Sequence, residues 1–298
     1  MTFVLAGGSG FLGSRLRARL ERDGHRVLNL TRSARQGRSG DITWQPDGSP
    51  GQLATHLEGA HAVVNLAGEN IAGGRWTSAR KESLRRSRLL ATRTIAGAIA
   101  ACSRPPATLV SGSAVGYYGP RGDDVVTERT PAGSDFLARL CVDWEQEAGA
   151  AASPDTRLAI VRTGLVLGAD GGALKKMLWP FTFGLGATMG SGGQYMPWIH
   201  VDDWVSMIVW ILSSDQARGT FNATAPTPVT NREFTRTLGR VLRRPAVLRA
   251  PAFVLKIALG EMAGVLLTGQ RALPVAAEEL GFRFAHRDLA PALRSLGV

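Results

Sequence analysis

The chain has few cysteines and few histidines. Its 298 residues include two cysteines, Cys102 and Cys141, and five scattered histidines. Two cysteines exclude a disulfide-stapled scaffold and fit a reducing cytoplasm. Because no Cys/His spacing typical of metal ligands occurs, the sequence predicts no metal site.

Long apolar runs are also missing. Hydrophobic residues make up 44% of the chain. Their longest stretches are interrupted within about a dozen residues, whereas a membrane helix needs about 20. The first apolar run is short and leads directly into glycines, which is not the layout of a signal peptide. We therefore expect a cytoplasmic protein without a membrane partner.

Acidic residues are outnumbered, 24 against 35 lysines and arginines, which gives a net charge of +11. Such a balance also suits a nucleic-acid binder. Much of the excess lies in two expected helices, residues 15–22 and 75–93. No nucleic-acid motif or row of aromatic residues accompanies these arginines, so we interpret them as a solvated face and expect no nucleic-acid partner.

What the chain does have is a glycine-rich turn near its start. Residues 2–6 (TFVLA) are long enough for one buried strand, residues 7–13 read GGSGFLG, and a helical pattern follows. Glycines at this spacing allow a tight turn, close approach of backbone N–H groups to a pyrophosphate, and close packing of helix on strand. This context predicts dinucleotide binding. The expected contacts are Gly7, Ser9, Gly10, Phe11, Leu12 and Gly13.

The second expected strand, residues 26–30, indicates which dinucleotide binds. NAD-specific folds place a carboxylate at the tip of this strand to accept from the ribose 2′-OH. Here the tip carries Arg32, Ser33 and Arg35 and no acid. Because a guanidinium suits a 2′-phosphate, we predict NADP(H) read by these three residues. The alternative is that the two arginines merely belong to a basic surface.

Strand-like and helical segments then alternate. The expected strands are residues 42–44, 62–68, 107–111 and 158–162, and the expected helices are 77–102, 135–151, 203–214 and 231–243. This alternation predicts an α/β fold with a doubly wound parallel (Rossmann) sheet that binds ligands at the carboxyl ends of its strands. We expect the Rossmann domain to cover residues 1–225, with 165–200 contributing to a substrate cleft, and a small, mostly helical domain to cover 226–298.

Two strand ends carry candidate site residues. The fourth strand ends in a small-residue loop, where we expect Leu66, Ala67 and Gly68 to contact the cofactor. The fifth ends in SGSAVGYYG (111–119), where Ser111 is expected at the nicotinamide. A serine there can hydrogen-bond a substrate carbonyl or hydroxyl, and a tyrosine can move a proton. The catalytic candidates are Ser113, Tyr117 and Tyr118; the alternative is a polar turn with packed tyrosines.

The order of GGSGFLG, NLAG, SGSAVGYYG and WIHVDD resembles that of the extended short-chain dehydrogenase/reductases. Four longer segments narrow the resemblance: NLAGENIAGGRW (65–76), FLARLCVDWE (136–145), RTGLVLGADGGALKKM (162–177) and LTGQRALP (267–274). They are similar to the atypical, epimerase-like subgroup often labelled nucleoside-diphosphate-sugar epimerase or cell-division inhibitor-like, which ends in a small domain of unknown function. The resemblance implies that Arg162, Thr163 and Gly164 lie beside the nicotinamide.

The chain departs from the superfamily at its catalytic pair. Active members carry Tyr-x-x-x-Lys on the helix after the fifth strand, where the lysine lowers the pKa of the tyrosine and holds the ribose. Aligned on Glu145, the matching positions hold Leu137 and Cys141, and residues 130–150 contain neither tyrosine nor lysine. Leucine cannot transfer a proton, and cysteine lacks the fixed charge. The usual mechanism therefore cannot be carried over.

Other polar residues are candidates to replace that pair. They are Glu69, Asn70, Arg162, Lys175, Lys176, Gln194 and Trp198. His200 is interpreted as a structural partner of Asp202 or Asp203, with a catalytic base as the alternative. We predict an NADP(H)-dependent oxidoreductase or epimerase-like enzyme that acts on an unidentified small molecule, with a homodimer left open. The alternative function is a catalytically silent NADP(H)-binding redox sensor or regulator.

Overall fold

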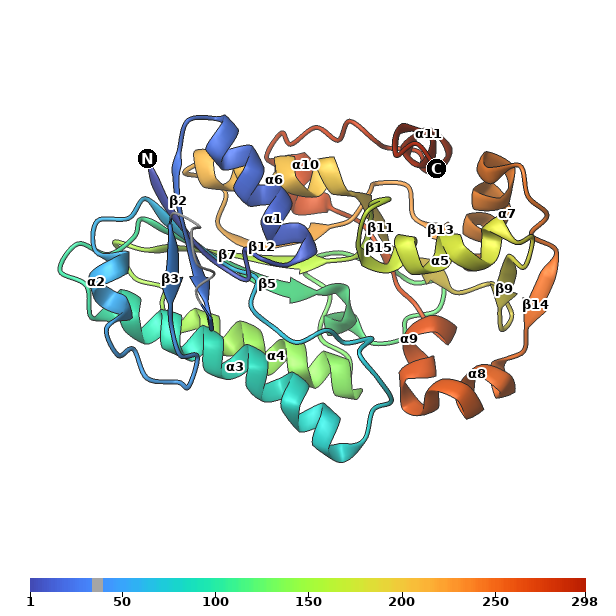
Figure 1. Ribbon diagram of the computed structural model, residues 1–298, viewed down its shortest axis with the longest axis horizontal. Helices are drawn as coiled ribbons and strands as arrows, with labels where there is room; N and C mark the ends of the chain where they lie inside the picture. Colours follow the sequence, from blue (N-terminus) through green and yellow to red (C-terminus); the bar gives the residue numbers. More distant parts are fainter. Residues whose placement is uncertain (34–39) are drawn as a thin grey trace.

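The computed structural model describes residues 1–33 and 40–298, and a seven-stranded parallel sheet runs through it (Figure 1). The strands stand in the order β12-β7-β5-β4-β1-β2-β3. They are β1 (Thr2–Ala6), β2 (Arg26–Thr31), β3 (Asp41–Thr43), β4 (Ala62–Asn65), β5 (Thr108–Ala114), β7 (Arg157–Thr163) and β12 (Gly219–Ala223). The predicted doubly wound parallel sheet is confirmed.

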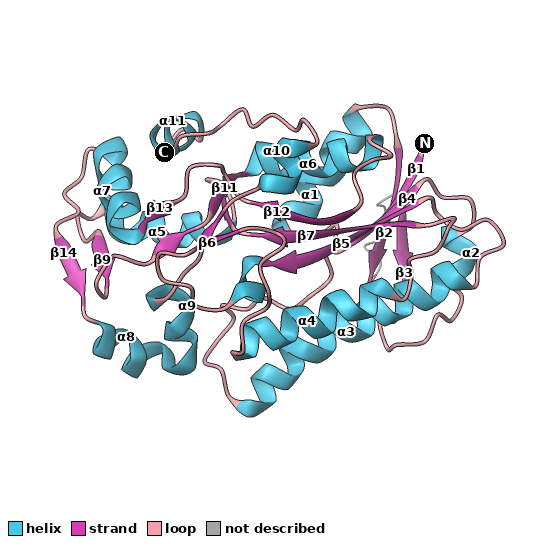
Figure 2. Ribbon diagram, turned by 180° about the vertical axis from the view of Figure 1, so that it is seen from behind, coloured by secondary structure: helices cyan, strands magenta, loops and turns pink. Residues whose placement is uncertain are grey.

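Helices cover both faces of this sheet (Figures 1 and 2). On one face lie α3 (Ser78–Ala100) and α4 (Phe136–Gly149), with the short α2 (Leu53–Leu57) beside them. On the other face lie α1 (Phe11–Arg22) and α6 (Val201–Ser213). The strands are buried from both sides, which is why a segment such as Ala62–Asn65 is apolar almost throughout and does not alternate.

The predicted helices and strands match these elements to within a few residues, with two informative differences. The expected fourth strand, 62–68, already ends at Asn65. Its side-chain Oδ1 accepts the N–H of Ala67 at 3.1 Å and turns the chain out of the sheet. The edge strand β12 was not recognised as a strand, because Gly219–Ala223 contains only one large apolar residue, Phe221.

The remaining elements are small and lie mostly toward one end of the molecule (Figure 1). They are η1 (Val115–Tyr118), β6 (Val125–Val126), β8 (Leu165–Leu167), α5 (Gly172–Thr182), β9 (Ala187–Met189), β10 (Tyr195–Met196), β11 (Trp198–His200), β13 (Val229–Thr230), α7 (Asn231–Leu242), β14 (Leu248–Ala250), α8 (Ala252–Leu259), η2 (Gly260–Met262), α9 (Ala263–Leu267), β15 (Arg271–Ala272), α10 (Val275–Glu279) and α11 (Leu289–Ser295). Within the described ranges, none of the helices combines the length and apolarity needed to span a membrane.

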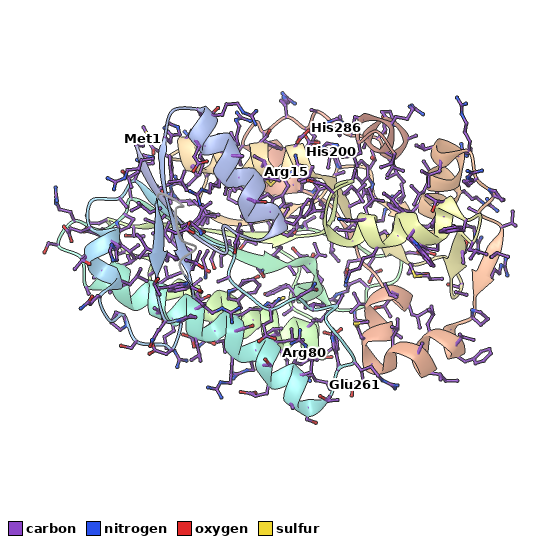
Figure 3. All side chains as sticks on the ribbon, viewed as in Figure 1. Met1, Arg15, Arg80, His200, Glu261 and His286 are labelled. Atoms are coloured by element: carbon purple, nitrogen blue, oxygen red, sulfur yellow. The ribbon has the colours of Figure 1, made fainter. Side chains whose placement is uncertain are left out.

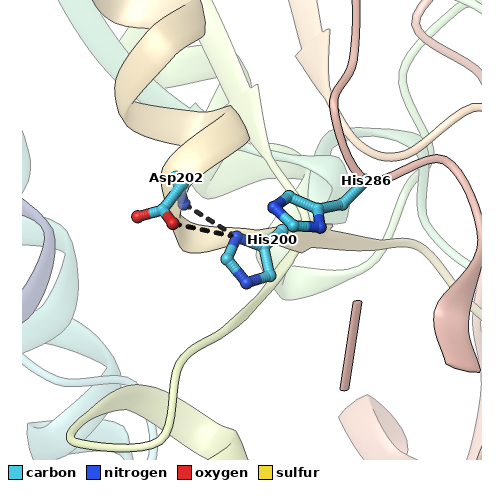
Figure 4. Close-up of side chains that lie close together, drawn as sticks. All are labelled: His200, Asp202 and His286. Carbon is cyan, nitrogen blue, oxygen red and sulfur yellow. Dashed lines mark hydrogen bonds and ion pairs between the residues drawn. The ribbon is translucent and has the colours of Figure 1, made fainter. Parts of the chain in front are cut away.

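His200 joins α6 to the C-terminal segment, in line with its structural interpretation. Its Nδ1 accepts the backbone N–H of Asp202 at 3.1 Å and caps α6, and Ser295 Oγ lies 3.3 Å from its Nε2. The ring stacks on His286 with 3.8 Å between centroids (Figure 4). Both ring nitrogens are therefore engaged within the protein. Burial, with the neighbouring His286, lowers the pKa of His200, so the neutral ring is favoured.

One buried hydroxyl ties the sheet to both helices on its α3/α4 face. Thr92 Oγ1, in α3, accepts Asn65 Nδ2 from β4 and Trp144 Nε1 from α4, each at 2.8 Å. Thr92 and Asn65 are fully buried. Loss of this acceptor would leave two donors without a partner in the interior, which costs more than the net gain from a hydrogen bond.

We predict that Thr92→Val, which is nearly isosteric, lowers the free energy of unfolding by about 1–3 kcal/mol or more, the cost of unsatisfied buried groups. Urea unfolding measures the change. The matched control is Thr182→Val on α5, whose exposed hydroxyl donates to Trp179 O at 2.7 Å; a surface change of this kind is worth about 0.5 kcal/mol or less. Equal effects of the two substitutions would contradict the account of Thr92.

Candidate cofactor and active site

The turn between β1 and α1 is shaped for close approach. Gly7 has a φ of +83°, and a Cβ there would lie 2.8 Å from the backbone of Leu66. A Cβ on Gly13 would collide with the Gly7 carbonyl. The N-cap residue of α1 is Gly10, and no described side chain caps this helix. The N–H groups of its first turn are therefore left for an anion, which the helix dipole also favours.

The other residues of the turn have separate roles. Ser9 is exposed, and Leu12 packs against the core between the sheet and α1. The Phe11 ring lies against the loop that follows β8, so closely that a Cβ on Gly168 or Gly171 would meet the ring. Phe11 thereby fixes the position of that loop over the start of α1.

The tip of β2 presents Arg32 and Ser33, both exposed. The backbone there is fixed by Thr31, whose Oγ1 donates to Ser33 O at 2.9 Å and accepts the Ser33 N–H at 3.3 Å. Arg35 lies outside the described residues. Among the described residues, this tip holds no carboxylate. A 2′-phosphate is therefore still the proposed partner of these residues.

At the end of β4, the chain runs through Leu66, Ala67 and Gly68 to Glu69. Ser83 Oγ donates to Glu69 Oε1 at 2.8 Å, and Arg80 forms an ion pair with Oε2. The Ser83 hydrogen bond, followed by the charge of Arg80, lowers the pKa of Glu69. Figure 3 shows Arg80 on the amino-terminal part of α3, near Glu261. Glu261 forms an ion pair with Lys81, the next residue of α3, and this ion pair joins α3 to η2.

The two serines of β5 differ in their partners. Ser111 is 1% exposed, and its Oγ has no hydrogen-bond partner among the described residues. Ser113 Oγ donates to Glu145 Oε1 at 2.6 Å. Because its proton is directed at Glu145, the remaining lone pairs of Ser113 are suited to accept a hydrogen bond. The Ser111 hydroxyl, which has no described partner, lies near the hydrogen-bonded Ser113 hydroxyl, and the two indicate a polar site in this part of β5.

A buried ion pair holds the same region together. Arg162 from β7 donates to Glu145 from α4 through Nε at 2.9 Å and Nη2 at 2.8 Å. The two side chains are 5% and 11% exposed. Although burial opposes the charge, the bonded carboxylate raises the pKa of Arg162 above its ordinary value. The paired geometry is the strong, bidentate kind.

The two candidate tyrosines sit against this arginine in different ways. Tyr118 is fully buried; its hydroxyl donates to Asn222 Oδ1 at 2.7 Å and accepts from Arg162 Nη1 at 3.0 Å. Burial raises the pKa of Tyr118 to about 12. Tyr117 is partly exposed, and its ring centroid lies 3.3 Å from the Arg162 guanidinium carbon. Only Tyr117 combines this position with contact to solvent.

Leu137 and Cys141 lie where the resemblance implies a tyrosine and a lysine. Leu137 packs against η1, since a Cβ on Gly116 would be 3.2 Å from the Leu137 Cβ. Cys141 Sγ is 3.7 Å from Ala114 O, and burial raises its pKa to about 11. Cys141 is therefore a neutral core thiol, as the sequence suggested.

The other expected residues are divided between surface and interior. Thr163 Oγ1 accepts Trp204 Nε1 at 3.1 Å, and a Cβ on Gly164 would collide with Pro197 O; both residues are partly exposed. Lys175 and Lys176 are exposed. Gln194 Nε2 donates to Met189 O at 3.0 Å and to Leu266 O at 2.8 Å, and Trp198 is fully buried.

Sequence reasoning missed three residues of this region. Glu145 served only as an alignment anchor, Asn222 lies in the unrecognised β12, and Arg88 was counted in a solvated face. Arg88 is instead 8% exposed. The helical spacing could have indicated this, because position 88 lies on the same face of the helix as Leu84, Ala91 and Ile95.

This strand order, with a glycine turn between β1 and α1, defines a Rossmann-type fold. The family model described as the NAD dependent epimerase/dehydratase family matches residues 3–223, and a domain of unknown function matches residues 250–296. The chain belongs to the NAD dependent epimerase/dehydratase family. Its resemblance to an atypical, epimerase-like subgroup with a small C-terminal domain is thereby confirmed.

Individual relatives agree with this assignment. An epimerase family protein of Mycobacterium bovis is 44% identical over 292 residues, which are 97% of this chain and 95% of the relative. The crystal structure of the human epimerase family protein SDR39U1 (isoform 2) with NADPH is 34% identical, with a TM-score of 0.92 and 99% of each chain covered. A nucleoside-diphosphate sugar epimerase of Corynebacterium glutamicum is 33% identical, with a TM-score of 0.82, and covers all of this chain and 58% of its own.

The buried Tyr118 should be visible in a titration. The chain contains three tyrosines, Tyr117, Tyr118 and Tyr195. Because the folded-state pKa of Tyr118, about 12, lies above the unfolded value of about 10, its stabilisation is complete below pH 10 and is lost as the pH rises through 12. We expect one late step in the tyrosinate absorbance, removed by Tyr118→Phe and kept in Tyr195→Phe. Ionisation of all three tyrosines near pH 10 in the folded protein would refute the burial argument.

Proposed function

We propose that this protein is an NADP(H)-dependent oxidoreductase or epimerase-like enzyme that acts on an unidentified small molecule. The observation that carries the proposal is the uncapped amino end of α1 behind a turn of closely packed glycines. That arrangement offers backbone N–H groups to a pyrophosphate and leaves no room for side chains at Gly7 and Gly13. Family membership and the NADPH bound by a relative of 34% identity support the same cofactor.

The residues present fit an NADP(H) molecule along the carboxyl ends of the sheet. Gly7, Gly10 and the first turn of α1 would hold the pyrophosphate. Arg32, with Ser33, would pair with the 2′-phosphate, and Arg35 remains part of the same proposal. The Ser111 hydroxyl, which has no partner among the described residues, lies opposite Asn65 at the end of β4 and Ile160 within β7 and would gain a partner from the nicotinamide half.

When bound, the cofactor supplies or accepts a hydride. The chain must then hold the substrate and handle its proton. Ser113 is oriented by Glu145 so that its lone pairs can accept from a substrate hydroxyl. Tyr117, partly exposed beside Arg162, is the first candidate for proton transfer. Tyr118 is the third candidate. Because its hydroxyl is buried, Tyr118 would act by holding Arg162 through their hydrogen bond.

A catalytically silent NADP(H) sensor is the second candidate function. The observation that favours it is the pair Leu137 and Cys141, since Leu137 carries no ionisable group and burial keeps the Cys141 thiol neutral near pH 7. The two functions share the cofactor and differ only in turnover, so a kinetic experiment separates them.

Cofactor choice gives the first test. If Arg32 pairs with the 2′-phosphate, calorimetry should show NADPH binding much more tightly than NADH. Charged hydrogen bonds are worth about 1.5–3 kcal/mol, so Arg32→Ala should reduce that preference about tenfold or more. Arg22→Ala, an exposed arginine at the end of α1, controls for net charge and should leave the preference unchanged. Equal wild-type affinities for the two cofactors would rule the assignment out.

Turnover gives the second test. NADPH oxidation should be screened against carbonyl compounds and nucleotide sugars, then repeated with Ser113→Ala and Tyr117→Phe. General acid–base catalysis contributes about 10²–10⁴-fold, so loss of the true donor should lower kcat by that order. Unchanged rates in both variants and in Tyr118→Phe would reject these donors. Tight NADPH binding without turnover on any substrate would establish the silent binder instead.

A further inference from the structure

Arg88 is a buried cation on α3. It is one of two buried arginines in the described part of the chain, together with Arg162. Its face of the helix also carries Leu84 and Ile95, both fully buried. Helical spacing therefore directs the guanidinium toward the sheet rather than toward solvent, where the other arginines of α3 contribute to the positive surface.

The Arg88 guanidinium packs against the loop that follows β4. Its Nη2 donates to Glu69 O at 2.9 Å, and its Nη1 donates to Leu84 O at 3.0 Å. A Cβ on Gly68 would be 3.1 Å from the Arg88 Cζ. Trp144 of α4 covers it from the other side, with its ring centroid 5.3 Å away. Two of the five N–H donors of an arginine are thus used by backbone oxygens.

The charge of Arg88 has no ion-pair partner among the described residues. The nearby Glu69 carboxylate pairs with Arg80 instead. Burial lowers the pKa of Arg88, but arginine stays protonated in proteins. An uncompensated buried charge is costly, and such charges are concentrated at functional sites. Trp144, which covers Arg88, lies one helical turn from Cys141 on α4, the position at which the resemblance implies a lysine.

We propose that Arg88 supplies, from α3, the positive charge and hydrogen-bond donors that relatives supply with a lysine from α4, and that it thereby holds the cofactor ribose next to the nicotinamide. This inference rests on the proposed NADP(H) binding. The lysine of the Tyr-x-x-x-Lys pair has two tasks, and Arg88 takes over the one that needs no tyrosine. Asn65 at the end of β4 pairs with Ser111 of β5, so Arg88 and Ser111 border the same part of the carboxyl edge at which Rossmann folds bind their dinucleotide.

The experiment removes the positive charge at position 88 of α3 and restores it at position 141 of α4. NADPH affinity and thermal unfolding are measured for Arg88→Lys, Arg88→Gln and the double variant Arg88→Gln/Cys141→Lys. Arg88→Gln should weaken NADPH binding about tenfold or more, Arg88→Lys should stay within a few-fold of wild type, and Cys141→Lys should restore binding in the Gln background. The control is Arg85→Gln on the same helix, whose Arg85–Asp143 pair is partly exposed; its affinity should not change.

The outcomes separate this inference from the function on which it rests. Wild-type protein that does not bind NADPH would refute both. Normal NADPH binding by Arg88→Gln would overturn the inference and leave the proposed function standing. Loss of stability with no rescue of affinity by Cys141→Lys would mean that Arg88 only packs. If Arg88→Gln does not fold, Arg88→Met, which keeps the apolar stem, takes its place: a loss of NADPH affinity of about tenfold or more supports the inference, and wild-type affinity overturns it.

Discussion

The buried pair between Arg162 and Glu145 is the interaction on which the candidate site depends. It joins β7 to α4, and through the bonds of these two residues to Ser113 and Tyr118 it also fixes β5 and η1. Removal of one partner from such a pair typically costs about 3–5 kcal/mol, because an uncompensated charge remains. The polar groups at these strand ends therefore keep one arrangement, as a preorganised binding site requires.

A second consequence follows from the topology of the sheet. In a parallel sheet the carboxyl ends of neighbouring strands meet at one edge, so residues far apart in sequence become neighbours. Here that edge gathers the glycine turn, the Gly68–Glu69 backbone next to Arg88, and the Ser111 hydroxyl, for which the described residues provide no partner. Both buried arginines of the described chain border it. Arg162 is paired with Glu145, so the positive charge at this edge comes from Arg88, and it suits an anionic dinucleotide better than a neutral ligand.

Local signals in the sequence were enough for the fold. A short apolar run, a glycine turn and helical spacing each report on neighbouring residues, and they predicted β1, α1 and the alternation that follows. The partners of the site residues were different, because Glu145 meets Ser113 and Arg162 only after α4 packs on the sheet. Likewise, the hydroxyl of Tyr118 is occupied by Asn222, 104 residues away. Arg88 is intermediate: its helical spacing indicated a buried face, but the basic composition of α3 concealed it.

The carboxyl edge of the sheet is the proposed binding site for NADP(H), and a crystal structure of the protein grown with NADPH would locate the cofactor. We expect the pyrophosphate against the first turn of α1, the 2′-phosphate at Arg32 and the nicotinamide half between Ser111 and Arg88. A cofactor bound elsewhere, or in the opposite direction along the sheet, would show that this edge is not the NADP(H) site.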